Sequence, residues 1–113
     1  MDIETQLPLT EPAFFILLAL SSGPQYGYAI MKDTVLLSHG RVQMSTSTLY
    51  GAIKRLRDLD WITYSVVESG IENGRERKVY QLTDLGRNIL KAEGARLQSL
   101  AALAQKAGES VSP

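Results

Sequence analysis

The chain has 113 residues, of which 44% are hydrophobic, and its formal net charge at pH 7 is zero. This length and apolar fraction predict one domain with a real hydrophobic core. The absence of cysteine excludes a disulfide framework and a thiolate metal site, and the only histidine, His39, stands beside Gly40 in a predicted loop. No glycine-rich phosphate loop or paired-carboxylate motif is present, so we expect neither an enzyme nor a metal or cofactor site.

No stretch of the sequence predicts a membrane span or an export signal. The longest uninterrupted apolar run, residues 13–20, is too short, because a spanning helix needs about 20 residues. The N-terminus has no basic region followed by a cleavage site. We therefore expect a cytoplasmic protein without a membrane partner.

The first predicted helix begins after a short arm. Residues 1–9 have no clear period and carry Pro8, which suggests an arm that is loose or ordered only on contact. Thr10-Glu11-Pro12 is a typical helix start, with a hydroxyl cap and a first-turn proline. The run Ala13–Leu20 is apolar on every side, so one face would pack on the core and another on a second chain. The alternative is a central buried helix of a monomer.

A second helix is predicted from about Tyr26 to Leu37. Its core face would comprise Tyr26, Ala29, Ile30 and Leu37. Ser38-His39-Gly40 closes this helix, because glycine readily adopts the left-handed conformation that ends helices.

The third predicted helix, residues 45–59, has two chemically different faces. Leucine, isoleucine and alanine recur on one side at helical spacing, at Leu49, Ala52, Ile53, Leu56 and Leu59. The opposite side carries Ser47, Tyr50, Lys54 and Arg57. The helix starts in a run of Ser and Thr that can cap it, at an end made positive by the helix dipole. These groups are typical of a helix that lies against nucleic acid; the alternative is an ordinary solvated amphipathic helix.

A β-hairpin follows. Residues 62–68 and 77–82 are rich in β-branched and aromatic residues, and Asn73-Gly74 between them is a turn signal. The tip and returning strand carry Arg75, Arg77 and Lys78. These cations fit a basic DNA-facing surface, although edge strands also carry cations as protection against aggregation. Residues 41–82 as a whole are mildly basic, with seven Lys or Arg against five Asp or Glu.

The last predicted helix spans residues 83–107, with Thr83 as its cap and Asp84 favourable to its dipole. Its wide apolar stripe continues through Leu97 and beyond. Some 23 residues make a helix of about 34 Å, which exceeds a small domain's core. The half from Leu97 onward would therefore pack on another chain, or alternatively fold back on the first helix. Residues 108–113 should fray.

Three helices followed by a hairpin form the pattern of a winged helix-turn-helix. We expect a mostly α fold with a small β-hairpin, divided into an arm (1–9), a winged helix-turn-helix domain (10–82), a dimerisation helix (83–107) and a frayed tail (108–113). The expected dimer interface comprises Phe14, Phe15, Leu18, Leu97, Leu100 and Ala104.

In this order and spacing, three segments resemble the PadR-type transcriptional regulators of the short subfamily. They are Tyr26-Gly27-Tyr28-Ala29-Ile30, the stretch from Ser47 to Leu56, and the stretch from Gly74 to Arg87. The resemblance covers about residues 12–107. It implies a homodimeric repressor of inverted-repeat operators on double-stranded DNA, with the third helix in the major groove and the wing on the neighbouring backbone or minor groove. It also implies a small aromatic or cationic inducer.

Carried over by position and chemistry, the predicted DNA-binding residues are Ser45, Thr46, Ser47, Thr48, Tyr50, Lys54, Arg75, Arg77 and Lys78. The sequence departs from the family at Asp60-Trp61-Ile62, where a Gly-Leu-Ile turn is usual, and we expect Trp61 to pack the hairpin base. The last helix has no tryptophan of the kind that sandwiches flat drugs in multidrug-binding members. A winged-helix protein-interaction module without DNA binding is the alternative, favoured by the zero net charge.

Overall fold

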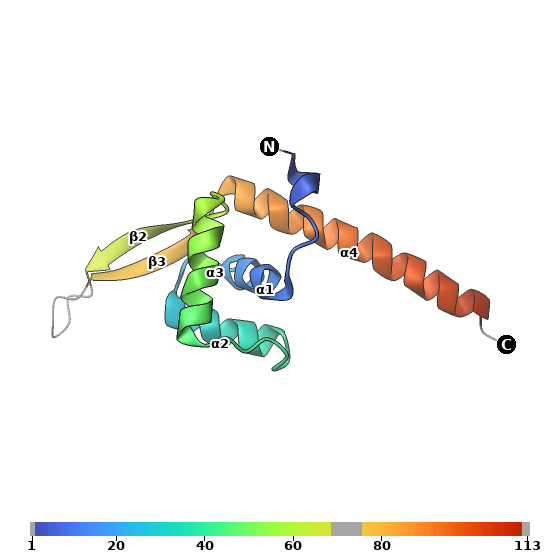
Figure 1. The fold of residues 1–113 in the computed structure, drawn as a ribbon, viewed down its shortest axis with the longest axis horizontal. Helices are drawn as coiled ribbons and strands as arrows, with labels where there is room; N and C mark the ends of the chain where they lie inside the picture. Colours follow the sequence, from blue (N-terminus) through green and yellow to red (C-terminus); the bar gives the residue numbers. More distant parts are fainter. Residues whose placement is uncertain (1, 69–75, 112–113) are drawn as a thin grey trace.

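The computed structural model describes residues 2–68 and 76–111. In chain order the elements are the 3-10 helix η1 (Ile3–Gln6), α1 (Glu11–Leu20), β1 (Gln25–Tyr26), α2 (Gly27–Leu37), α3 (Thr46–Asp58), β2 (Ile62–Glu68), β3 (Glu76–Leu82) and α4 (Asp84–Val111). The hairpin β2–β3 and the far half of α4 project from the body in opposite directions (Figure 1), so the molecule measures 66 × 33 × 22 Å. This arrangement confirms the predicted winged helix-turn-helix with a long C-terminal helix. No helix within the described ranges is long and apolar enough to cross a membrane.

One hydrophobic core joins α1, α2, α3, the sheet and the start of α4. The predicted apolar face of α3 supplies Leu49, Ile53 and Leu56, each at most 2% exposed. Trp61 is 3% exposed and belongs to the same core, next to the strand that begins at Ile62. Its predicted place at the base of the hairpin is therefore correct.

The sheet has one strand more than the sequence predicted. Strands β2 and β3 pair antiparallel, from Ile62 opposite Leu82 to Glu68 opposite Glu76. The two-residue strand β1 pairs with the other edge of β3, which gives the order β1-β3-β2. The prediction missed β1 and extended the helix over Tyr26, because a two-residue strand has no period of its own. The predicted Asn-Gly turn lies outside the described residues.

Hydroxyl side chains start the helices, as the sequence predicted. The Thr10 side chain accepts a hydrogen bond from the backbone N–H of Ala13 at the start of α1. At the start of α3, the Ser45 side chain accepts one from the N–H of Thr48. Each hydroxyl satisfies a first-turn N–H that has no partner within its helix. The structure therefore confirms both caps.

The link from the hairpin to α4 is held by Thr83 and a glycine. The Thr83 hydroxyl accepts a hydrogen bond from the N–H of Gly86 and donates one to the carbonyl oxygen of Asp60. The backbone N–H of Thr83 donates to the carbonyl oxygen of Trp61 over 3.0 Å. A Cβ at position 86 would overlap that same carbonyl oxygen. The start of α4 thus lies directly on the turn between α3 and β2.

Helix α2 buries less of its predicted face than expected. Ile30 is fully buried, but Leu37 is 42% exposed, so its assignment to the core is wrong. Leu37 is the last residue of the helix and lines an open hollow beside α1. The predicted stop is correct, since His39 and Gly40 both have positive φ angles and the Gly40 N–H donates to the carbonyl oxygen of Val35.

The N-terminal segment is attached to α4 and is not a loose arm. Residues 3–6 form η1, and beyond it the N–H of Leu9 donates to Oε2 of Glu93 over 2.7 Å. Glu93 is 2% exposed and also accepts hydrogen bonds from the guanidinium of Arg96. The bond from Arg96 and the one from Leu9 lower the pKa of Glu93 against the opposing effect of burial. A buried carboxylate therefore holds this segment against α4.

Helix α4 is longer than predicted and does not fold back. It continues past residue 107 to Val111. Residues 97–108 are all exposed, and Figure 1 shows this half extending away from the body. The alternative prediction, that the far half of α4 folds back on α1 of the same chain, is therefore wrong.

Candidate nucleic-acid interface

The outer surface of α3 carries the hydroxyl-rich group that the sequence predicted. Because Leu49, Ile53 and Leu56 face the core, the other side of the helix is left at the surface. The predicted residues on α3 and its cap are all exposed: Ser45, Thr46, Ser47, Thr48, Tyr50 and Lys54. Such hydroxyls can donate to phosphate oxygens and to base edges.

Tyr50 has a packing role as well as an exposed edge. It is 44% exposed, and its hydroxyl lies against Gly27 at the start of α2, where a Cβ would overlap it. A side chain at position 27 would require the Tyr50 hydroxyl to move away from the start of α2.

Lys54 is not a free cation. Its Nζ lies 3.1 Å from Oδ2 of Asp58, one helical turn on, and both side chains are more than 60% exposed. An exposed pair of this kind contributes little to stability. It does place a carboxylate beside the cation that the sequence predicted for DNA, so Lys54 would have to leave Asp58 to reach a phosphate.

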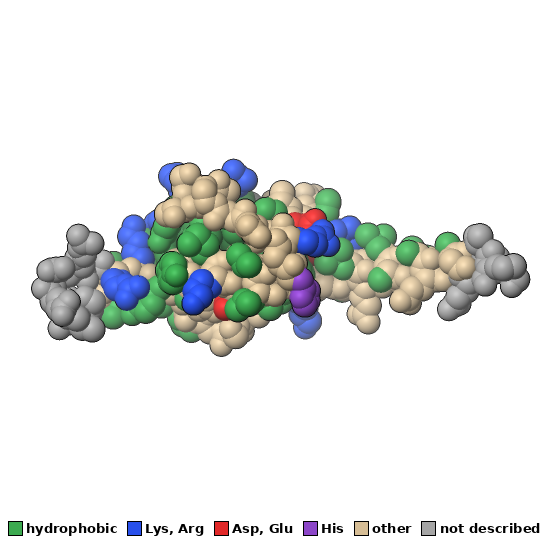
Figure 2. All heavy atoms as spheres, turned by 90° about the horizontal axis from the view of Figure 1, so that it is seen from below, with side chains coloured by type: hydrophobic (Ala, Val, Ile, Leu, Met, Phe, Trp, Pro, Cys, Tyr) green, Lys and Arg blue, Asp and Glu red, His purple; other side chains and the backbone are tan. Residues whose placement is uncertain are grey.

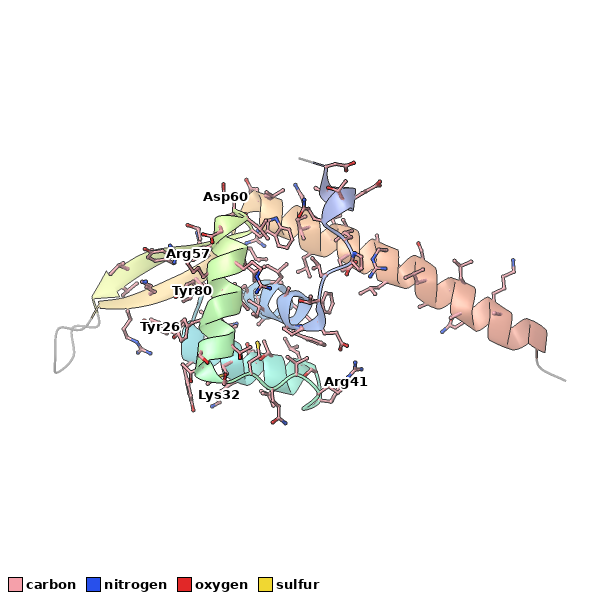
Figure 3. All side chains as sticks on the ribbon, in the orientation of Figure 1. Tyr26, Lys32, Arg41, Arg57, Asp60 and Tyr80 are labelled. Atoms are coloured by element: carbon pink, nitrogen blue, oxygen red, sulfur yellow. The ribbon has the colours of Figure 1, made fainter. Side chains whose placement is uncertain are left out.

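Three cations of α3 and the hairpin have aromatic partners. The guanidinium carbon of Arg57 lies 4.1 Å from the centre of the Tyr64 ring, and Nζ of Lys78 lies 4.9 Å from the same centre. Arg77 is over the Tyr26 ring at 4.0 Å. A cation over an aromatic face is attracted by the ring's quadrupole without losing its charge. Figure 3 shows Arg57, Tyr80 and Tyr26 along the side of α3 from which the hairpin projects.

None of these three cations pairs with a carboxylate among the described residues. The ion pairs found there are Arg41–Glu11, Lys54–Asp58 and Arg96–Glu93. Among the described side chains, Arg57, Arg77 and Lys78 thus lie against aromatic rings, whereas the side chains of Glu68 and Glu76 on the same hairpin are outside that description. Figure 2 shows Lys and Arg side chains near the hairpin side of the molecule, next to the residues drawn in grey. The predicted Arg75 lies outside the described residues.

Tyrosines fill the corner between α3 and the sheet. Tyr80 is 3% exposed, and its ring centre lies 6.1 Å from that of Tyr64. Burial raises the pKa of the Tyr80 phenol, the nearby phenols of Tyr50 and Tyr64 raise it further, and Arg57 lowers it. Tyr80 thus remains a neutral phenol at the base of the corner, and Arg57 is close to it.

The sequence placed Arg57 on the outer face of α3 but did not count it among the DNA-binding residues. Its contact with Tyr64 depends on how the hairpin returns across the helix. The spacing of the two residues alone gives no indication of that.

Two further surfaces carry exposed apolar side chains. The predicted dimer residues of α1, Phe14, Phe15 and Leu18, are half-buried, whereas Leu97 and Leu100 on α4 are 40% and 48% exposed and Ala104 is also exposed. A hollow of about 330 Å³ between α1 and α2 is lined by Leu18, Ala19, Ser21, Ser22, Asp33, Leu36 and Leu37. It is mostly apolar with one carboxylate at its edge.

Comparisons with known proteins agree with this architecture. A PadR family transcription regulator from Clostridium difficile is 22% identical, with a TM-score of 0.72 over 86% of this chain and 97% of that one. A PadR family transcriptional regulator from Eggerthella lenta is 28% identical, with a TM-score of 0.66 over 88% and 85%. Bacillus subtilis PadR in complex with operator DNA is 29% identical, with a TM-score of 0.62 over 71% of this chain and 44% of that one.

Among proteins with curated descriptions, none matches the chain significantly. The model of the transcriptional regulator PadR-like family matches residues 16–92. The matched region runs from the core of α1 through α3 and the hairpin into α4. The chain belongs to the PadR-like family of transcriptional regulators.

Proposed function

We propose that this protein is a cytoplasmic, homodimeric repressor that binds inverted-repeat operator DNA, and that it has no enzymatic activity. The observation that carries the proposal is the joint surface of α3 and the hairpin. The start of α3 exposes a row of hydroxyls, and Arg57 in its last turn, with Arg77 and Lys78 on the hairpin, forms no ion pair among the described side chains. In this arrangement α3 reads base edges in the major groove, and the hairpin cations bind the neighbouring backbone.

The proposed DNA-binding residues are those the sequence indicated. Ser45, Thr46, Ser47, Thr48, Tyr50 and Lys54 act from α3, and Arg75, Arg77 and Lys78 act from the hairpin. The operator-bound structure of Bacillus subtilis PadR supports the assignment of DNA as the partner.

The neutral net charge and the projecting far half of α4 support the proposed dimer. A single copy presents only a few cations, so its electrostatic affinity for DNA is small. A two-fold dimer doubles the contacts and reads two half-sites about one helical turn apart. The exposed apolar residues of the far half of α4, with Phe14, Phe15 and Leu18 on α1, are the proposed interface.

We further propose that a small aromatic or cationic compound releases the repressor. The hollow between α1 and α2 supports this class of ligand, because it combines apolar walls with the carboxylate of Asp33. Release requires that the ligand bind one dimer geometry more tightly than the other. A compound screen that leaves operator affinity unchanged throughout would remove the inducer from the proposal.

The test is fluorescence anisotropy of the purified protein on labelled DNA from upstream of its own gene, at two salt concentrations and beside a scrambled duplex. We expect tight, salt-sensitive binding that prefers the native duplex. The variants Lys54→Ala and Arg77→Ala should each weaken binding and reduce its salt slope. If no duplex is bound and neither variant changes anything measured on DNA, a protein-interaction module becomes the better description.

A further inference from the structure

The corner between α3 and the hairpin contains a cluster of two cations and a tyrosine, of which only Lys78 is among the proposed DNA-binding residues. Arg57 comes from the last turn of α3, Lys78 from β3, and both approach the ring of Tyr64 on β2. Three separate elements therefore meet at one aromatic ring. We call Arg57, Tyr64 and Lys78 the corner cluster.

The geometry of B-DNA gives this corner a specific neighbour. The major and minor grooves are separated by one sugar–phosphate strand. A protein that places a helix in the major groove and a hairpin in the next minor groove must straddle that strand. The strand then passes through the corner between helix and hairpin, where Figure 3 shows Arg57 pointing from α3 toward the sheet.

The charge of the corner cluster fits that neighbour. Arg57 is half-buried and Lys78 is exposed, and neither has a carboxylate partner in the described part of the chain. Lys54, one turn earlier on α3, is by contrast already paired with Asp58. The guanidinium and the ammonium lie 4.1 and 4.9 Å from the centre of the same ring, and each can bind a phosphate through charge-assisted hydrogen bonds.

Tyr64 would act by holding the two cations in place. A ring that both cations approach restricts long side chains that otherwise sample many rotamers, and this reduces the entropy lost on binding. The ring itself need not contact DNA. Tyr64 is therefore a positioning residue in this account.

We propose that the corner cluster binds the backbone phosphates of the DNA strand that separates the two grooves, with Arg57 and Lys78 as the phosphate ligands and Tyr64 as their support. This inference rests on the proposed DNA-binding function. It adds Arg57 and Tyr64 to the interface and assigns Lys78 a phosphate of the strand between the grooves.

The experiment measures the salt dependence of binding to a 24-base-pair duplex of random sequence between 50 and 200 mM salt, which isolates the phosphate contribution. Each of the variants Arg57→Gln and Lys78→Gln should reduce the steepness of log K against log[salt] by about 0.9 per protomer. Across this range of salt, the affinity of wild type should therefore fall by a factor about three times larger, per protomer, than the affinity of either variant. The matched control is Lys91→Gln, which removes one charge from an exposed position on α4 and should leave the slope unchanged.

Tyr64 is tested with two substitutions. Tyr64→Leu keeps both cations but removes the ring, and should weaken binding about two- to fivefold at fixed salt. Tyr64→Phe keeps the ring and should bind like wild type. Stoichiometric titration and the thermal unfolding midpoint of each variant show whether weaker binding comes from a changed corner cluster or from a loss of folded protein.

The outcomes separate the two proposals. If wild type binds with strong salt dependence while Arg57→Gln and Lys78→Gln behave like Lys91→Gln, the corner site is wrong and DNA binding stands. If Tyr64→Phe is as weak as Tyr64→Leu, the positioning role of the ring is wrong. If wild type shows no salt-dependent binding to any duplex, the proposed function fails and the corner site fails with it.

Discussion

At the scale of single residues, two glycines of the same helix have opposite roles. Gly86 lies in the first turn of α4, where a Cβ would overlap the carbonyl oxygen of Trp61. Gly94 lies farther along α4, exposed, with no neighbouring atom that a Cβ would meet. Both positions are helical, so alanine would raise helix propensity at each. Only the contact with the backbone of Trp61 distinguishes them.

We expect Gly86→Ala to lower the free energy of unfolding by about 1–3 kcal/mol, because the backbone must shift to admit the methyl group. Gly94→Ala should raise it by about 0.5–1 kcal/mol. Urea denaturation at pH 7 measures both changes. Equal effects in the two variants would show that the approach to Trp61 does not constrain α4.

At the scale of elements, Glu93 joins the N-terminal segment to α4. Its carboxylate accepts hydrogen bonds from the N–H of Leu9 and from Arg96, while its own side chain is buried. These bonds hold the pKa of Glu93 below its ordinary value of 4.5. A group whose pKa is lowered by folding stabilises the protein above its unfolded pKa and loses that contribution as the pH falls through the folded one.

Glu93→Gln should therefore reduce the free energy of unfolding by about 1–3 kcal/mol at pH 7, since hydrogen bonds to a charged acceptor are lost. The difference from wild type should shrink as the pH falls below 4.5, where the wild-type carboxylate becomes protonated. Denaturant titrations at pH 7, 5 and 3 measure it. A difference that is constant with pH would indicate that the charge of Glu93 is not involved.

At the scale of the whole molecule, the projecting end of α4 fits the proposed dimer. The body is compact, but the far half of α4 extends from it with Leu97, Leu100 and Leu103 between 40% and 64% exposed. An apolar row of this kind on a projecting helix is typical of an interface with another chain. The proposed spacing of two recognition helices would depend on how two copies of α4 pack.

We expect Leu100→Glu to shift the protein from dimer to monomer and to weaken operator binding, with little change in the folding of each copy. The matched control is Gln98→Glu, which adds the same charge on the other side of α4 and should leave the dimer intact. Sedimentation equilibrium over a range of concentrations measures the association. A wild-type protein that is monomeric at all concentrations, with or without DNA, would contradict the proposed interface.

The local pattern of the sequence was enough to predict most of the elements. The 3.6-residue period located the core face of α3, the hydroxyls of Thr10 and Ser45 located helix starts, and alternation located β2 and β3. These features depend on neighbours within about one helical turn, so they can be read without the fold. Short elements such as β1 and η1 have too few residues for a period, and only their partners, β3 and α4, stabilise them.

The sequence by itself determined the helices, the hairpin and the hydroxyl face of α3, because each depends on local spacing and chemistry. Only the tertiary structure decided which charges remain available. It paired Lys54 with Asp58, buried Glu93 beneath the N-terminal segment, and brought Arg57 and Lys78 to Tyr64. The Lys54–Asp58 pair lies within one turn of α3, whereas the other contacts join residues from different elements. Their distances depend on how α3, the sheet and α4 pack around one core, which no local pattern specifies.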